Sequence, residues 1–143
     1  MKDYYGWRAR IGLIYMASST VMEPEFHAMA PDGVSIHTDR IVLPAPTIEG
    51  LERMMERSEV QRCASFLAQA PLHVIMFGGT SATFLNGIGW DKKVIEQMEE
   101  VTHGIPASTT STAALHALRA VGARKISIAT PYLDVITDRA HPR

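Results

Sequence analysis

The sequence predicts an α/β fold in which an open, four-stranded parallel sheet carries helices on both faces. Three observations support this prediction: short apolar runs alternate with helical patterns, the connections are short, and no repeat or low-complexity stretch intervenes. Such alternation favours a parallel sheet because each strand returns to the sheet through a helix. A chain of 143 residues has the size of one ordinary domain.

Four segments have the pattern of β-strands. Arg10–Met16 and His73–Phe77 are continuous apolar runs, typical of strands that are covered on both faces. Val34–Leu43 contains polar residues within its apolar pattern, which predicts an edge strand with one face less buried. The fourth expected strand is Lys125–Ala129, which alternates apolar and polar side chains.

Helical patterns fill the remaining space. Thr47 has the residue type of an N-cap, and a long helix is expected to run from it to about Ala70. Further helices are expected over Trp90–Val101 and over about Thr112–Val121, and a last one begins after the fourth strand. The hydroxyl run Ser108–Thr112 is expected to cap the third of these helices.

Composition excludes several classes of partner. The 14 Lys and Arg residues nearly balance 15 Asp and Glu residues, so no basic field would attract nucleic acid. The apolar runs are much shorter than the roughly 20 residues of a membrane span. With one cysteine, Cys63, and no signal-peptide pattern at the N-terminus, we expect a reducing, cytoplasmic environment.

Three hydroxyl-bearing loops follow predicted strands, over residues 17–21, 78–84 and 130–132. In an open parallel sheet, ligands bind at the carboxyl ends of the strands. These loops are therefore expected to form one binding site.

The loop Gly78-Gly79-Thr80-Ser81 has the composition of an oxyanion site. Its glycines let a ligand approach the backbone, and its amides and two hydroxyls suit a carboxylate. It contains neither the G-x-G-x-x-G fingerprint of dinucleotide sites nor the Gly-Lys-Ser/Thr of a phosphate-binding loop. The same residues could instead form a tight turn whose hydroxyls cap the next segment.

The other two loops carry weaker signals. Ser18, Ser19 and Thr20 could donate hydrogen bonds to the same anion, although small hydroxyl residues also cap helices. Tyr132, held by Pro131, could donate to a substrate oxygen or could be a half-buried packing residue with a solvated hydroxyl.

Neither the histidines nor the cysteine predicts a catalytic or metal centre. The six histidines are scattered and lack the i, i+4 spacing of a zinc-binding helix. Cys63 falls on the apolar side of a predicted helix, where cysteine usually acts as a small buried hydrophobic residue. No metal site and no cysteine nucleophile are therefore expected.

Four motifs occur in a fixed order: Ser19–Phe26, Gly79-Thr80-Ser81, Ile105-Pro106-Ala107 leading into Thr110–Ala113, and Ala129–Tyr132. Together they resemble the maleate cis-trans isomerase and arylmalonate decarboxylase branch of the aspartate/glutamate racemase superfamily. The likeness extends from about Arg10 to Arg139. Residues 10–143 are therefore expected to form an amino-terminal lobe, and residues 1–9 an N-terminal extension.

The resemblance implies two flavodoxin-like lobes with the active site in the cleft between them and no metal or organic cofactor. Family members hold a substrate carboxylate with amides and hydroxyls and use cysteine on the neighbouring carbon. The substrate implied is a small dicarboxylate or an arylmalonate-like acid. The positions that match the carboxylate-binding groups are Thr80, Ser81 and Tyr132, and Ser18, Ser19 and Thr20 lie in the loop after the first strand.

The sequence departs from the isomerase pattern at two positions. Gly79 matches the position of the first cysteine in isomerases and racemases, and this glycine is the residue found in the decarboxylase. The loop after the first strand lacks the isomerase asparagine. The resemblance therefore implies decarboxylation rather than isomerisation, with the remaining cysteine supplied by a second lobe.

A complete family member contains a second lobe of similar size, so this lobe is expected to be truncated and inactive alone. Two alternatives remain open. The chain could be a non-catalytic module that binds small carboxylates as a homodimer, or a truncated product without an independent role.

Overall fold

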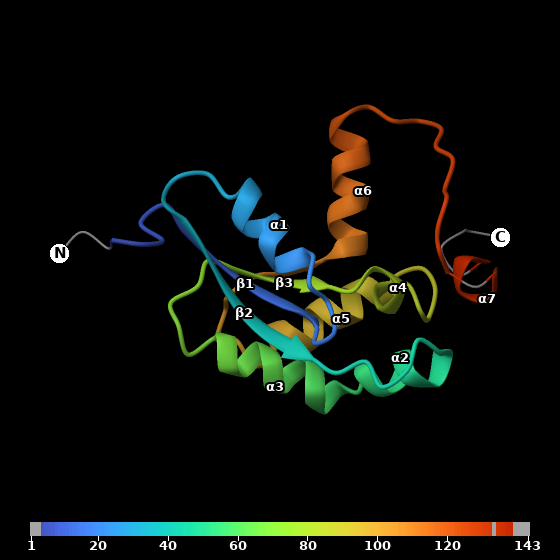
Figure 1. The fold of residues 1–143 in the computed structure, drawn as a ribbon, viewed down its shortest axis with the longest axis horizontal. Helices are drawn as coiled ribbons and strands as arrows, with labels where there is room; N and C mark the ends of the chain where they lie inside the picture. The colour runs from blue at the N-terminus through green and yellow to red at the C-terminus, as the bar shows by residue number, and fades with distance from the viewer. Residues whose placement is uncertain (1–3, 133, 139–143) are drawn as a thin grey trace.

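The structure, a computed structural model, describes residues 4–132 and 134–138 and contains one parallel sheet. Its strands lie in the order β2-β1-β3-β4 and are β1 (Ala9–Met16), β2 (Val34–Ile41), β3 (Val74–Gly78) and β4 (Ala107–Thr109) (Figure 1). The predicted four-stranded parallel α/β fold is confirmed.

Strand β1 lies inside the sheet and is paired on both sides. It pairs with β2 from Ala9↔Val34 to Met16↔Ile41, and with β3 from Ile11↔Val74 to Tyr15↔Gly78. The edge position of β2 confirms the prediction made from its polar residues. β1 begins at Ala9, the last residue of the predicted N-terminal extension.

The prediction of a fourth strand at Lys125–Ala129 is wrong. The fourth strand is Ala107–Thr109, which pairs with β3 at Ile75↔Ala107 and the next two positions. Residues 125–129 have no regular secondary structure, and Ile126 and Ile128 are 53% and 42% exposed. Alternation marks a segment that can form a strand, but strand formation also needs a neighbouring strand. Among the described residues, no strand pairs with this segment.

The described helices are α1 (Met22–Met29), α2 (Ile48–Met54), α3 (Arg57–Leu67), α4 (Thr80–Thr83), α5 (Trp90–Glu99), α6 (Thr110–Ala120) and α7 (Asp134–Thr137). Thr47 is the N-cap of α2, and its hydroxyl accepts a hydrogen bond from the Gly50 amide at 3.1 Å. The single long helix predicted from Thr47 to about Ala70 is in fact two helices. Helix α2 ends at Met54 and α3 begins at Arg57, so the break consists of the buried Met55 and the exposed Glu56.

Two helices occupy segments without a helical prediction. Helix α1 contains Pro24, which is tolerated because it lies in the first turn, where backbone amides have no intrahelical partner. Helix α4 is a single turn directly after the glycine pair. The predicted cap of α6 is confirmed at Thr109, whose hydroxyl accepts a hydrogen bond from the Thr112 amide at 3.2 Å.

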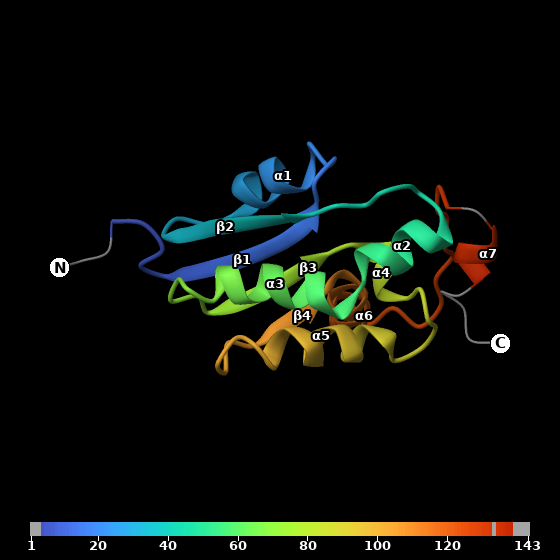
Figure 2. The ribbon, with the colours of Figure 1, turned by 90° about the horizontal axis from the view of Figure 1, so that it is seen from below.

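The hydrophobic core lies on one face of the sheet, where α2, α3 and α5 pack (Figures 1 and 2). Ile14, Ile75 and Phe77 point into it from the strands and are fully buried. Cys63 is also fully buried there, which confirms its role as a small hydrophobic residue, and burial raises the pKa of its thiol to about 12. Gly12 allows the close approach of the segment between α3 and β3, because a Cβ atom at this position would lie 2.7 Å from Leu72 Cδ1.

The other face of the sheet is covered only in part, by α1 and α6 (Figure 1). None of the residues of α6 is fully buried, and Leu115 is 46% exposed. After α6 the chain turns back to α7, where Ile136 joins the core. Within the described ranges, no helix is long and apolar enough to cross a membrane.

Candidate binding site at the carboxyl ends of the strands

The ends of β1, β3 and β4 bring three segments to one edge of the sheet. The loop of residues 17–21 follows β1, Gly79 and α4 follow β3, and α6 follows β4. The loops after β1 and β3 are neighbours, because Tyr15 is paired with Gly78 and the Met22 side chain lies against Gly78. The predicted third loop, residues 130–132, reaches this region from the segment after α6 and follows no strand.

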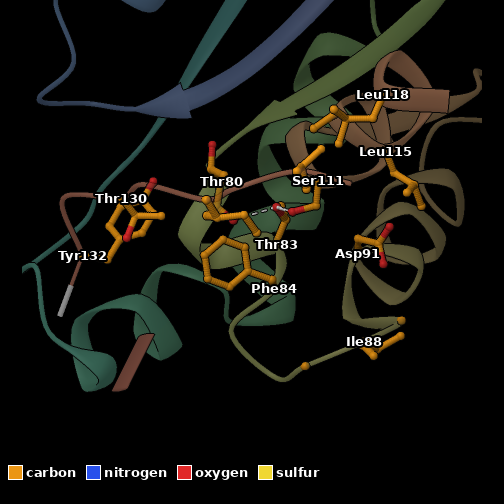
Figure 3. Close-up of a pocket in the computed structure, with 15 residues that line it drawn as sticks. Thr80, Thr83, Phe84, Ile88, Asp91, Ser111, Leu115, Leu118, Thr130 and Tyr132 are labelled. Carbon is orange, nitrogen blue, oxygen red and sulfur yellow. Dashed lines mark hydrogen bonds between the residues drawn. The ribbon is translucent and has the colours of Figure 1, made fainter. Parts of the chain in front are cut away.

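A cavity of about 480 Å³ opens beside α4 and α6 (Figure 3). Thr80, Thr130 and Tyr132 contribute hydroxyl-bearing side chains to its lining, and Thr130 and Tyr132 lie at the left side of the view in Figure 3. Apolar side chains form much of the remaining wall, and they come from α6 and the segment after it: Leu115, Leu118, Ile126 and Ile128. The cavity therefore combines hydroxyl-bearing side chains with an apolar wall.

Several hydroxyls near this cavity are engaged in holding the protein backbone. Thr83, which is buried, donates to the Thr80 carbonyl at 2.9 Å and is 2.6 Å from the hydroxyl of Ser111. Thr110 donates to the Phe77 carbonyl at 3.2 Å. These bonds connect α4, α6 and the end of β3, so their hydroxyls have structural roles.

The start of α6 is fixed by a second set of hydrogen bonds. Thr109 donates to Thr112 Oγ1 at 3.1 Å, and Thr112 donates to Asp91 Oδ2 at 2.6 Å. Asp91, in the first turn of α5, thus joins α5 to α6. This contact depends on the tertiary fold, and no spacing in the sequence indicates it.

Other hydroxyls at the same edge have no such role. Within the described residues, the side-chain hydroxyls of Thr80, Ser81 and Tyr132 form no hydrogen bond, and the same is true of Ser18 and Thr20. All five are therefore available to a ligand.

The Tyr132 ring is half-buried and makes an edge contact with Phe84, with ring centroids 6.1 Å apart. The nearby Thr130 hydroxyl is 2.8 Å from that of Thr137 in α7. The ring therefore packs against the protein as one interpretation predicted, and the hydroxyl forms no hydrogen bond within the described residues. Its donation to a substrate oxygen stays a prediction.

The glycine pair allows close packing on both faces of the sheet. A Cβ atom at Gly79 would lie 2.7 Å from Cε1 of Phe77, which is fully buried, and one at Gly78 would lie 2.1 Å from Sδ of Met22. Any side chain at residue 79 therefore requires the Phe77 ring to move. Gly79 is the single residue between β3 and α4, and the capping considered from the sequence is absent, because α4 has no side-chain cap. The Thr80 and Ser81 hydroxyls form no hydrogen bond within the described residues.

The structure brings the predicted residues together only in part. Thr80 and Tyr132 line the same cavity, whereas Gly79, Ser81 and the loop of Ser18–Thr20 are not among its lining residues. Thr83 and Ser111 line the cavity but were not predicted as site residues, because their hydroxyl composition resembles that of any helix start. In the part of the chain that is described, no cluster of three or more His, Cys, Asp or Glu residues could hold a metal ion.

Fold and site together define an open parallel α/β domain whose strand ends present a Gly-Gly turn and unengaged hydroxyls beside an apolar wall. The family model for arylmalonate decarboxylase matches residues 11–141. The chain belongs to the arylmalonate decarboxylase family.

Two curated relatives have different activities. The arylmalonate decarboxylase of Bordetella bronchiseptica is 30% identical over 125 residues, covering 83% of this chain and 51% of the relative. The maleate isomerase of Geobacillus stearothermophilus is 28% identical over 142 residues, covering 91% of this chain and 56% of the relative. The chain thus spans about half the length of the curated relatives that it matches.

Solved structures agree with this relationship. A variant of the maleate isomerase Iso from Pseudomonas putida S16, crystallised with maleate, superposes with a TM-score of 0.81 at 29% identity, over 92% of this chain and 56% of that one. A liganded double mutant of arylmalonate decarboxylase, with one glycine changed to cysteine and one cysteine to serine, gives 0.79 at 30% identity, over 92% and 54%. The predicted family is confirmed.

Proposed function

We propose that this chain is the amino-terminal half of a cofactor-independent enzyme similar to arylmalonate decarboxylase and maleate isomerase, acting in the cytoplasm. In this proposal Thr80, Ser81 and Tyr132 bind a carboxylate of a small dicarboxylate or arylmalonate-like substrate. The observation that carries the proposal is the division among the hydroxyls at the strand ends. Those of Thr83 and Thr110 bind backbone carbonyls, whereas those of the three proposed ligands have no partner within the described residues.

The chemistry of decarboxylation explains why free donors would be useful there. When the bond between the α-carbon and the departing carboxylate breaks, CO2 leaves and the electron pair spreads into the remaining carboxylate as an enediolate. Donors already aimed at those oxygens stabilise the charge that develops in the transition state. The α-carbon must then receive a proton from an acid.

This chain offers no suitable thiol for that proton transfer. Residue 79 is glycine, and the one cysteine, Cys63, is buried in the core on α3, with the pKa of its thiol raised to about 12 by burial. The acid is therefore expected from a second lobe. The absence of a thiol at residue 79 also favours decarboxylation over isomerisation through a cysteine nucleophile.

Two observations support the need for a second lobe. The relatives are about twice as long as the matched region, since the chain covers 51% and 56% of them. In addition, Leu115, Ile126 and Ile128 expose apolar surface on α6 and the segment after it. A second lobe placed against this surface would remove it from water. We expect the chain alone to show no turnover.

Ligand binding by the chain is the direct test of the carboxylate site. Phenylmalonate and maleate would be titrated into the labelled protein, and backbone amide shifts would be followed by NMR. The amides of Thr80 and Ser81 should shift, and Thr80→Ala and Ser81→Ala should weaken binding. Ser58→Ala, an exposed hydroxyl on α3, is the matched control and should bind as the wild type does.

Complementation tests the catalytic part of the proposal. The chain would be co-expressed with the carboxy-terminal half of an arylmalonate decarboxylase, and phenylacetate formation would be measured. Turnover should require both halves, and loss of one donor should reduce kcat/KM by about 100-fold, on the scale of a missing oxyanion donor. Unchanged binding and turnover in both the Thr80 and the Ser81 variants would rule out the assignment of this loop.

A further inference from the structure

A charged cluster lies beside the loop after β1, outside the proposed carboxylate ligands. It comprises Tyr15, Glu23, Thr38 and Arg40, from β1, α1 and β2. The Glu23 carboxylate accepts hydrogen bonds from the Tyr15 hydroxyl, from Thr38 Oγ1 at 2.9 Å and from Arg40 Nη2 at 3.0 Å. The Arg40 guanidinium also lies over the Tyr15 ring, 4.6 Å from its centroid.

The same guanidinium reaches into the loop. Arg40 Nη1 donates to the carbonyl oxygens of Ala17 at 3.0 Å and Ser19 at 3.2 Å. One side chain thus holds Glu23 with one nitrogen and two loop carbonyls with another. The planar fork of arginine can do this, whereas a lysine ammonium lacks that fixed geometry.

The arrangement leaves two of the three loop hydroxyls free. Within the loop, Arg40 binds backbone carbonyls only. The Ser19 hydroxyl accepts a hydrogen bond from the Val21 amide at 3.5 Å, whereas the hydroxyls of Ser18 and Thr20 form no hydrogen bond within the described residues. Both residues are exposed at the edge where β1 and β3 end side by side. A loop held by its backbone keeps a fixed shape while its side chains remain available.

The contacts also keep Glu23 charged. Hydrogen bonds from Tyr15 and then Thr38 lower the pKa of its carboxyl group, and Arg40 contributes in the same direction. Burial, followed by the hydrogen bond to Glu23, raises the pKa of Tyr15, so the phenol remains a donor. At neutral pH the cluster therefore contains a carboxylate, a guanidinium and a neutral phenol.

We propose that Glu23 and Arg40 are positioning residues that fix the loop of residues 17–21 so that its hydroxyls face the substrate bound at Thr80 and Ser81. This inference rests on the proposed function. Glu23 orients Arg40, and Arg40 holds the loop, so neither needs to touch the substrate.

Strand β2 provides a matched control on its opposite face. Asp39 and Arg62 form an ion pair at 3.3 Å, between β2 and α3, and Arg62 also pairs with Glu59 at 3.2 Å. Among the described residues, none of its hydrogen bonds or ion pairs reaches the loop after β1. Arg62→Met thus deletes two partly exposed ion pairs, whereas Arg40→Met deletes one, to Glu23. Only the removal of Arg40 should affect the loop.

The experiment measures loop order and ligand binding in the same variants. Arg40→Met, Glu23→Gln and the milder Tyr15→Phe would be compared with Arg62→Met by amide hydrogen exchange and by NMR titration with phenylmalonate. Melting temperature and circular dichroism would show which variants fold. Tyr15→Phe retains the ring under Arg40. If the charge variants unfold, loop exchange and ligand binding can still be measured in this variant.

We expect faster exchange of the Ser19 amide, which is hydrogen-bonded to Met16 O, in the three cluster variants and not in Arg62→Met. Phenylmalonate affinity should fall by about 10- to 100-fold, as expected when a binding group is misplaced without being removed. Arg40→Lys should restore only part of this loss.

The outcomes separate this inference from the function on which it rests. If loop exchange and affinity match the Arg62→Met control, the positioning role is overturned. If the wild type binds no carboxylate while Arg40→Met and Glu23→Gln still speed amide exchange in the loop, the proposed function is contradicted. The role of Arg40 and Glu23 in fixing the loop is then retained.

Discussion

Residues 9–109 and residues 110–138, here called the body and the arm, use similar apolar side chains with different results. In the body, all four strands are paired and Ile14, Ile75 and Phe77 are fully buried. In the arm, α6 buries none of its residues fully, and Ile126 and Ile128 remain partly exposed. Among the described residues of the arm, Ile136 of α7 joins the core and Tyr132 packs against it.

This difference shows that an apolar sequence pattern does not by itself stabilise a segment. A hydrophobic side chain stabilises a fold only when another surface covers it. In the body, the apolar side chains and the surfaces that cover them belong to the same described residues. For much of the arm, the described residues include apolar side chains but no surface that covers them fully. The body should therefore determine the stability of the chain, and the arm should depend on a partner surface.

The largest test of this comparison is a pair of apolar truncations. Phe77→Ala should lower the free energy of unfolding by about 3–5 kcal/mol, because it leaves a cavity in a fully buried site. Ile128→Ala in the arm should change it by less than about 0.5 kcal/mol, as a surface substitution does. Urea denaturation of both variants measures the difference, and equal losses would contradict the division between body and arm.

A second test compares two thiols. Cys63 in the body is buried and burial raises the pKa of its thiol to about 12, whereas a cysteine placed at exposed Ser127 should have an ordinary pKa. At pH 8, iodoacetamide should label Ser127→Cys, in a Cys63→Ala background, on the order of 100-fold faster than it labels wild-type Cys63. Comparable rates would mean that the core around α3 opens readily.

The raised pKa of Cys63 also gives a pH dependence with a definite sign. The folded state keeps the thiol protonated above the ordinary pKa of 9.0, whereas the unfolded state loses the proton there. The free energy of unfolding should therefore fall as the pH rises from 9.0 towards 12, and Cys63→Ala should lack this component. Chemical denaturation at several alkaline pH values measures it.

Smaller effects than that of Phe77→Ala are expected at the two threonine N-caps. Thr47→Ala and Thr109→Ala each remove a cap and should each cost about 1 kcal/mol locally. Loss of Thr47 should lower the melting temperature, because α2 contributes Leu51 and Met54 to the core. Loss of Thr109 should chiefly speed amide exchange within α6. A uniform rise in exchange across the body in Thr109→Ala would argue against an independent arm.

The strands β1, β2 and β3 could be predicted because each carries enough apolar residues to show its pattern. Strand β4 could not, since it is a three-residue strand of Ala, Ser and Thr that is defined only by its pairing with β3. Lys125–Ala129 misled in the opposite way, with a strand pattern but no neighbouring strand among the described residues. The local sequence shows whether a segment can form a strand, but it does not show whether a neighbouring strand is present to pair with it.

The candidate site shows the same limit. The glycine pair and the following hydroxyls were visible in the sequence, because their composition is unusual next to a buried strand. The division between free and engaged hydroxyls was not, because Thr80 and Thr83 have the same side chain and differ only in what surrounds them. The roles of Thr80, Ser81 and Tyr132 as carboxylate ligands remain predictions.

The order of the strands has a consequence for how the chain folds during synthesis. Because β4 ends at Thr109, every strand of the sheet has been made before α6 begins. Pairing β1 with β3 joins Ile11 to Val74, so the sheet must wait for a long loop to close, which slows parallel sheets in general. Once residue 109 has left the ribosome, the body can form while the arm is still being translated.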